Sequence, residues 1–378
     1  MEKNIKTRGL YYFALDNGWN NQQLVKNCGA LAYVFHKNYG FHSVMVGYKH
    51  GEHPNLQKYL PGVELEFYKG LGQEFRIQYI RENYQKIDLM VCHNHFEDFG
   101  EMIKLYKSLR PDGKVYLETD TNDDFQDRFV LNNESNQDFL NNCDVVGVSC
   151  RKMQKFLSRK WKCKVDYITN GFYNFANIDI ENIIDWHERK NIVLTVGRLG
   201  VYPKNTELLL HAFSMIHHKI PTWKLQLVGS MTKDFKELLK HKFFKDESLK
   251  EKIIISNEIN DKVELMNIYQ HSKIFVLPSI SEGGIPNVIA EALFNGCYIV
   301  SSDISGSIDA TNNSECGDIF PINNIEALEN ILLMRCSDDE YLFNSSKKAI
   351  EYAHHKLDFE KIMARLYYLL YGSENKGE

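Results

Sequence analysis

Several features that would point to particular protein classes are missing from this sequence. No stretch is apolar over the roughly 20 residues that a membrane-spanning helix needs. The first nine residues are polar and charged, so a secretory signal peptide is not expected. Neither half carries the GxGxxG loop of dinucleotide-binding proteins. The formal net charge of −5 gives no reason to expect a nucleic-acid partner. These absences favour an ordinary globular protein.

Cysteine is present, but no pair has the spacing of a zinc ligand or redox motif. The eight cysteines are scattered along the chain and none forms a CxxC pair. Neither a structural zinc site nor a disulfide framework is therefore indicated. Such a pattern fits a reducing compartment, and we expect a cytoplasmic location.

What the sequence does contain is a repeated alternation of strand-like and helix-like segments. A chain of 378 residues suits two domains better than one core. Because both halves alternate β and α, we expect an α/β fold with two Rossmann-like, doubly wound parallel sheets facing a cleft. The segment just before residue 189 is polar and acidic without a strand pattern, so we place the linker there. The expected domains are 1–176 and 189–356.

The most informative stretch is SISEGGIPNVIAEALFNG, residues 279–296, which follows a strand-like run at 273–278. Strand, glycine-containing loop and helix is the order in which doubly wound folds present a ligand site. Pro286 suits the first turn of a helix, and Gly296 is placed to end it. The N–H groups of residues 284–288 should then point out of the fold beside the positive end of the helix dipole. This arrangement predicts an anion site, most often for phosphate.

Two carboxylates flank this predicted anion site, Glu282 in the loop and Glu291 in the helix. A carboxylate beside phosphate is unfavourable unless it has another task, such as accepting hydrogen bonds from sugar hydroxyls. On these residues alone, a second interpretation is equally consistent. In that interpretation Glu282 only interacts with the helix dipole, and Glu291 is a solvated helix residue.

A second stretch, GRLGVYPKN at 197–205, follows another strand pattern and precedes an amphipathic segment. The planar guanidinium of Arg198 and the ammonium of Lys204 both suit a diphosphate. Together, GRLGVYPKN and SEGGIPNVIAEA resemble the donor-site motifs of retaining glycosyltransferases with the GT-B fold, glycosyltransferase family 4 in particular. The resemblance covers the C-terminal half, where the two motifs occur in the family's order.

This resemblance implies a role for each motif residue and a nucleoside-diphosphate sugar as co-substrate, with no cofactor. Arg198 and Lys204 would bind the diphosphate, Glu291 would hold the ribose hydroxyls, and Glu282 would contact the transferred sugar as a catalytic residue. The family usually spaces its two glutamates eight positions apart, whereas here the spacing is nine, so the loop is one residue longer. The phosphate cradle would then be formed by Gly283, Gly284, Ile285, Pro286, Asn287 and Val288.

The resemblance also extends to the first half and the C-terminus. A last helix, expected at about 357–373, would cross back onto the first domain, which would carry the acceptor. The loop after the first strand would approach the donor phosphates, which singles out Gly18 and Asn20 as substrate-binding residues. The equally consistent interpretation is that Asn20 or Asn21 caps a helix over 22–39.

Two further positions of the first half are candidates for the acceptor side. In the resembled family, a stretch like His93-Asn94-His95 follows a sheet strand and faces the acceptor. We take His95 as a candidate catalytic residue, although plain loop histidines are the alternative, and nothing nearby completes a metal site. Many family members place a histidine after the next strand, where this sequence has Glu118 and Asp120. Asp120 is therefore a second candidate, with a cation-binding or solvated turn as alternatives.

We therefore expect a metal-independent, retaining hexosyltransferase acting on a glycan, lipid-linked or protein acceptor in bacterial surface glycan or glycoprotein assembly. A non-catalytic sugar-nucleotide-binding subunit of a transferase complex and a GT-B nucleotide-sugar epimerase are the alternatives. The basic segment 151–164, which also contains Phe156 and Trp161, suggests peripheral membrane contact, with a solvated helix as the alternative.

Overall fold

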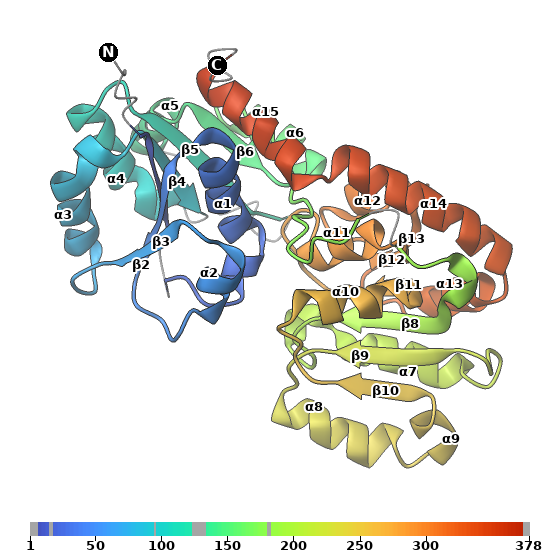
Figure 1. Ribbon diagram of the computed structural model, residues 1–378. Coiled ribbons are helices and arrows are strands. Elements are labelled where there is room, and N and C mark those ends of the chain that lie inside the picture. The colour runs from blue at the N-terminus through green and yellow to red at the C-terminus, as the bar shows by residue number, and fades with distance from the viewer. Residues whose placement is uncertain (1–6, 15–17, 94–95, 123–133, 180–182, 373–378) are drawn as a thin grey trace. The chain divides into compact units, whose positions relative to one another are not determined.

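The computed structural model describes residues 7–14, 18–93, 96–122, 134–179 and 183–372, which form two compact units (Figure 1). The first unit contains the chain up to Thr169 together with the segment from Phe359 onward, and the second runs from Asn170 to Asp358. Each unit is built on one parallel sheet with helices on both faces. The predicted α/β class with two Rossmann-like domains is confirmed, and the cleft between them stays a prediction.

The first sheet has seven parallel strands among the described residues, in the order β3-β2-β1-β4-β5-β6-β7. The order reverses between β1 and β4, which makes this the topological switch point where doubly wound folds bind ligands. The strands are β1 (Gly9–Phe13), β2 (His42–Gly47), β3 (Val63–Phe67), β4 (Leu89–His93), β5 (Lys114–Thr119), β6 (Val145–Val148) and β7 (Asp166–Tyr167).

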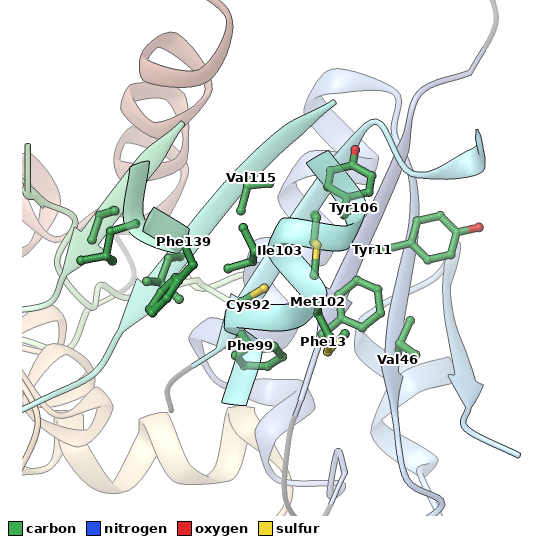
Figure 2. Close-up of a cluster of buried hydrophobic side chains, with 14 of the residues drawn as sticks. Tyr11, Phe13, Val46, Cys92, Phe99, Met102, Ile103, Tyr106, Val115 and Phe139 are labelled. Carbon is green, nitrogen blue, oxygen red and sulfur yellow. The ribbon is translucent and has the colours of Figure 1, made fainter. Parts of the chain in front are cut away.

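Alternate residues of the central strands point to opposite faces, and each face is covered by helices. Figure 2 shows Tyr11 and Phe13 of β1 packing against Phe99, Met102 and Tyr106, all at most 2% exposed. Burying each such side chain contributes about 1.5–3 kcal/mol. The helices are α1 (Asn27–Tyr39), α2 (Pro54–Tyr59), α3 (Gln73–Asn83), α4 (Phe96–Leu109), α5 (Glu134–Asn141), α6 (Arg151–Lys160) and α15 (Phe359–Tyr371).

The second sheet has six parallel strands in the order β10-β9-β8-β11-β12-β13, again within the described ranges. Its order reverses between β8 and β11, so the second switch point lies there. The strands are β8 (Lys190–Val196), β9 (Lys224–Val228), β10 (Ile253–Ser256), β11 (Ser272–Leu277), β12 (Tyr298–Ser302) and β13 (Gly317–Phe320).

Two separate apolar clusters cover the two faces of the second sheet. One contains side chains of α7, α8 and α13, and the other contains side chains of α10, α11 and α14. The helices are α7 (Thr206–Ile216), α8 (Lys233–Leu238), α9 (Glu247–Lys250), α10 (Lys262–Gln270), α11 (Asn287–Phe294), α12 (Ser307–Ala310), α13 (Ile325–Cys336) and α14 (Asp339–Lys356).

Two element boundaries differ from the sequence-based expectation. The helix expected from residue 22 begins only at Asn27, because Lys26 is extended and a separate 3₁₀ turn precedes it. The chain enters the second unit at Asn170 rather than after residue 176. Phe172 explains this early entry, since its ring lies 4.1 Å from that of Phe294 and its N–H donates to the Leu357 carbonyl at 2.7 Å.

Candidate functional site

The two predicted donor motifs meet at the switch point of the second sheet. The loop at 197–205 follows β8 and the loop at 278–286 follows β11, and these two strands are neighbours. The loops are joined directly, because the Ile280 N–H donates to the Pro203 carbonyl at 2.9 Å. The sequence motifs are thus brought together at the position where open α/β sheets bind ligands.

The first pair of predicted site residues forms an ion pair between these loops. Lys204 ends a 3₁₀ turn and donates from Nζ to Oε1 of Glu282. The same oxygen accepts a hydrogen bond from the Ser279 hydroxyl at 2.7 Å. Both charged side chains keep contact with solvent, 25% for Lys204 and 13% for Glu282. An incoming phosphate can therefore compete for the ammonium, and sugar hydroxyls can compete for the carboxylate.

Arg198 lies on the same loop as Lys204 and is exposed. Over the ranges that the structure describes, its guanidinium has no hydrogen bond and no ion pair. A planar cation without an internal partner, next to an ammonium that has one, suits an anion with several oxygens.

The glycine-containing loop leads directly into α11. Gly284 has a φ of +58°, a left-handed conformation that favours glycine. The carbonyl oxygen of Gly284 lies so close to Gly306 that a Cβ on Gly306 would be 2.0 Å from this oxygen. Ile285 is fully buried and anchors the loop, and Pro286 caps the helix that begins at Asn287.

The N–H groups at the start of α11 have no acceptor within the helix. Asn287 and Val288 are the first two residues of this helix and both are half-buried, as is Gly283 in the loop before it. The anion site that the sequence predicts at these N–H groups stays a prediction, a few residues along the chain from Glu282. Gly296, with a φ of +76°, follows the helix as expected.

Glu291 lies deeper in the domain than Glu282. The residue is 8% exposed, and each of its carboxylate oxygens accepts one hydrogen bond from another helix, α10. Lys262 Nζ donates to Oε1 at 3.0 Å, and the Tyr269 hydroxyl donates to Oε2 at 3.0 Å. Glu291 is therefore not the solvated helix residue of the alternative interpretation, since its carboxylate is oriented by two buried donors. Burial, and to a smaller extent the nearby Glu291, raises the pKa of Tyr269 well above its ordinary value. The hydroxyl therefore stays protonated and remains a donor.

Sequence reasoning missed Lys262 and Tyr269. The signal available was weak: they are seven residues apart on a helix, a spacing that puts both on one face. Nothing in the local pattern identifies Glu291 as their partner, because it is 22 to 29 residues away in the chain.

In the first domain, the structure gives Gly18 and Asn20 local structural tasks. Gly18 is buried with a φ of +68°, and a Cβ there would lie 1.9 Å from the Tyr48 carbonyl oxygen. Asn20 Oδ1 accepts from the Gln23 N–H at 3.0 Å, while its own N–H donates to Gln23 Oε1 at 2.9 Å. This reciprocal arrangement is a capping box at the 3₁₀ turn before α1. Asn20 is also exposed, so its role in substrate binding stays a prediction.

The switch point of the first sheet holds a cluster that the sequence did not reveal as a unit. Glu118 Oε2 lies 2.8 Å from His93 Nδ1 and accepts a hydrogen bond from the Tyr12 hydroxyl. On the other side of the imidazole, Cys28 Sγ lies 3.8 Å from His93 Nε2. Tyr12 is fully buried, and the His93 and Glu118 side chains are 18% and 16% exposed.

The pKa shifts in this cluster describe a buried ion pair. Burial opposes the charge on His93, but Cys28 and Glu118 together raise the pKa of the imidazole well above its ordinary value. Burial likewise opposes the charge on Glu118, and His93 with Tyr12 lowers the pKa of that carboxyl below its ordinary value. Tyr12 stays protonated, because burial raises the pKa of its hydroxyl.

The remaining first-domain candidates are Asp120 and His95. Asp120 is exposed and its Oδ1 accepts from the Ser149 hydroxyl at 2.9 Å. His95 lies outside the described residues. Within the described part of the chain, no three His, Cys, Asp or Glu side chains gather closely enough to hold a metal ion. None of the helices described here is both long and apolar enough to span a membrane.

Part of the chain is similar in sequence to proteins of known activity. Residues 177–356 match the sequence model of the family described as "Glycosyl transferases group 1". The chain is 32% identical over 193 residues to an Escherichia coli UDP-Gal:α-D-GlcNAc-diphosphoundecaprenol α-1,3-galactosyltransferase, which covers 49% of this chain and 48% of that protein. It is 24% identical over 258 residues to a Campylobacter jejuni N,N′-diacetylbacillosaminyl-diphospho-undecaprenol α-1,3-N-acetylgalactosaminyltransferase, covering 65% and 60%.

The fold is similar to solved structures over nearly its whole length. Anabaena HepE in complex with UDP aligns with a TM-score of 0.74 at 15% identity, covering 95% of this chain and 98% of that one. By contrast, the matched segments of the two curated relatives are about half to three-fifths of their lengths. The chain therefore has the GT-B fold, and its residues 177–356 match the group 1 family of glycosyl transferases.

Proposed function

We propose that this protein is a retaining glycosyltransferase that moves a hexose from a nucleoside-diphosphate sugar to a lipid-linked glycan in bacterial surface glycan assembly. The observation that carries the proposal is the meeting of Arg198, the Lys204–Glu282 pair and the start of α11 at one switch point. All of these residues lie inside the segment that matches the group 1 family.

In the proposed reaction, the bond between the sugar and the β-phosphate breaks and negative charge develops on the departing diphosphate. Arg198, Lys204 and the N–H groups of Ile285, Asn287 and Val288 stabilise this charge as it forms, which is where preorganised electrostatics help most. Glu282, released from Lys204 by the phosphate, accepts hydrogen bonds from the transferred sugar. Glu291, oriented by α10, accepts hydrogen bonds from the ribose. In this proposal, these groups neutralise the negative charge of the departing diphosphate, and no metal ion is needed.

The lipid-linked acceptor is proposed from the named activities of the curated relatives, both of which act on diphospho-undecaprenol substrates. One surface of the first domain supports it. Residues 151–164 include no Asp or Glu, and seven exposed cations lie on α6 and just after it. Met153, Leu157 and Trp161 of the same segment pack into the domain core, so the cations lie on its outer side. We place this helix against the anionic membrane surface, where such an acceptor resides.

The test is a transfer assay with purified protein, UDP-galactose or UDP-N-acetylgalactosamine as donor, and a diphosphoprenol-linked N-acetylhexosamine as acceptor. We expect donor-dependent elongation, with an α-linked product by NMR. Arg198→Ala should lower the rate by roughly a hundredfold or more, because one lost transition-state contact costs about 3 kcal/mol. The matched control is Lys236→Ala, an exposed cation on α8.

Other results would contradict the proposal in distinct ways. Conversion of the donor without acceptor would identify an epimerase, and nucleotide-sugar binding without turnover would identify a binding subunit. A β-linked product would rule out retention. Equal activity of Arg198→Ala and the control would remove the phosphate-binding assignment.

A further inference from the structure

The cluster at the switch point of the first sheet has a feature that the proposed transfer does not use. Cys28 Sγ lies 3.8 Å from His93 Nε2, and His93 Nδ1 lies 2.8 Å from Glu118 Oε2. Thiol, imidazolium and carboxylate therefore lie in series, an order in which the cation stabilises a neighbouring thiolate and the carboxylate holds the cation in place. The Tyr12 hydroxyl donates to the same carboxylate oxygen and keeps it in place.

The helix that carries Cys28 favours negative charge at this sulfur. Cys28 is the second residue of α1, a helix of 13 residues, and the first turn contains no acidic side chain. The positive end of the helix dipole is therefore not neutralised by a carboxylate within that turn. Thiols at helix starts beside a histidine are the ones that react as thiolates.

We propose that Cys28 is an activated thiol and a covalent modification site for small soft electrophiles. His93 is already the imidazolium that Glu118 balances, so the thiol proton leaves to solvent and the thiolate lies beside this cation. With a thiosulfonate such as methyl methanethiosulfonate, the thiolate sulfur attacks the sulfenyl sulfur. A new S–S bond forms as the S–S bond of the reagent breaks, and methanesulfinate leaves with the electron pair. His93 stays protonated throughout.

The other cysteines provide an internal reference. Burial raises the pKa of six of them, to about 11 for Cys163 and about 12 for Cys297 and Cys316, and higher for Cys92, Cys143 and Cys336. None of these six has a histidine among the groups that shift its pKa. Cys163 and Cys336 are half-buried, whereas Cys28 is only 7% exposed. Access alone would thus make Cys28 the slower thiol, and activation predicts the opposite order.

The experiment is a time course of labelling of the folded full chain by methyl methanethiosulfonate at one neutral pH, read peptide by peptide by mass spectrometry. Cys28 should be modified at least about tenfold faster than Cys163 and Cys336, because each tenfold gain in thiolate population raises the rate in proportion. His93→Gln and Glu118→Gln should each remove this advantage. His36→Gln, on the same helix α1, is the matched control and should leave the rate unchanged.

Folding of each variant is checked by circular dichroism, and the wild-type comparison stands even if one variant unfolds. Labelling of Cys28 no faster than Cys163 and Cys336 in the wild-type protein would overturn the proposal. An unchanged Cys28 rate in folded His93→Gln would also overturn it, since the imidazole would then not activate the thiol.

Discussion

The two domains repeat one topology but place different chemistry at their switch points. Between β8 and β11, the second domain presents Arg198 and Lys204 on loops, next to the start of a helix. Between β1 and β4, the first domain presents Tyr12 and His93 on the strands themselves. Loops at a switch point can exchange partners with a ligand, whereas side chains on strands are held by the sheet.

The two ion pairs are similarly exposed, 25% and 13% for Lys204 and Glu282 against 18% and 16% for His93 and Glu118, but they differ in how freely their members can change partner. Lys204 is 25% exposed and Arg198 is exposed without an internal partner among the described residues, so both can take a ligand's charge. Tyr12 is fully buried, and Glu118 is held by two neighbours. The comparison teaches that a charged group near a ligand site is informative about binding only when its internal partners can be replaced. The first cluster should therefore matter most for stability and thiol chemistry, and the second for donor binding.

The largest predicted difference between the two clusters is in the free energy of unfolding. Glu118→Ala leaves the His93 charge and the Tyr12 hydroxyl without their shared acceptor. Removing one partner of a buried ion pair costs about 3–5 kcal/mol. In contrast, Glu282→Ala should cost about 1 kcal/mol, because Lys204 is 25% exposed on a loop and its ammonium can turn to water when the carboxylate is removed. Thermal unfolding followed by circular dichroism should show a much larger fall in Tm for Glu118→Ala.

The control is the pH dependence of the stability that Glu118→Ala loses. The pKa of Glu118 is lowered on folding, so its stabilisation is present above about pH 4.3 and is lost as pH falls through the lowered value. The pKa of His93 is raised, so its stabilisation is present below about pH 6.5 and is lost as pH rises through the raised value. The destabilisation should be greatest between these limits. A cost independent of pH would mean that packing, not charge, holds the cluster.

Sequence reasoning recovered the second switch point better than the first. Arg198, Lys204 and Glu282 lie in two short motifs, each running from a strand through a loop toward a helix, and doubly wound folds bring such loops to one edge. The cluster of Tyr12, His93 and Glu118 depends on the sheet order β1-β4-β5, which local patterns do not specify. Taken separately, Tyr12 is a residue of the first predicted strand, while His93 and Glu118 are candidates only at the ends of their own strands, with nothing to pair them.

Gly18 and Asn20 in the first domain show a second limit of predicting site residues from the sequence. The sequence predicts that Gly18 is a ligand-loop residue, yet its left-handed φ and its close approach to the Tyr48 carbonyl already require glycine. Asn20 pairs with Gln23 at a turn, but it does not cap the helix as the sequence-based alternative has it, because that helix begins only at Asn27. Turn chemistry and ligand binding select the same residue types, so a sequence pattern cannot separate them.

A prediction of intermediate size tests whether only the first domain binds an anionic membrane surface. Lys155→Gln with Arg159→Gln removes two exposed charges from α6. Because each basic residue near an anionic surface contributes about 1 kcal/mol, binding to anionic phospholipid vesicles should weaken by roughly thirtyfold. Lys236→Gln with Lys240→Gln makes the same charge change on the second domain and should have little effect. Equal weakening by both pairs would assign membrane binding to net charge alone.

The smallest effect concerns Glu291, a buried carboxylate of the second domain. Lys262→Met leaves this carboxylate oriented only by Tyr269, so part of the ordering must be supplied when nucleotide binds. Fixing one such side chain costs about 1 kcal/mol, which raises the Kd for UDP by about fivefold in calorimetry. Lys250→Met, an exposed lysine paired with Glu247, is the matched control. If Lys262→Met leaves the Kd unchanged, Tyr269→Phe is added to it. This double substitution removes both internal donors, so an unchanged Kd would then contradict contact between Glu291 and the ribose.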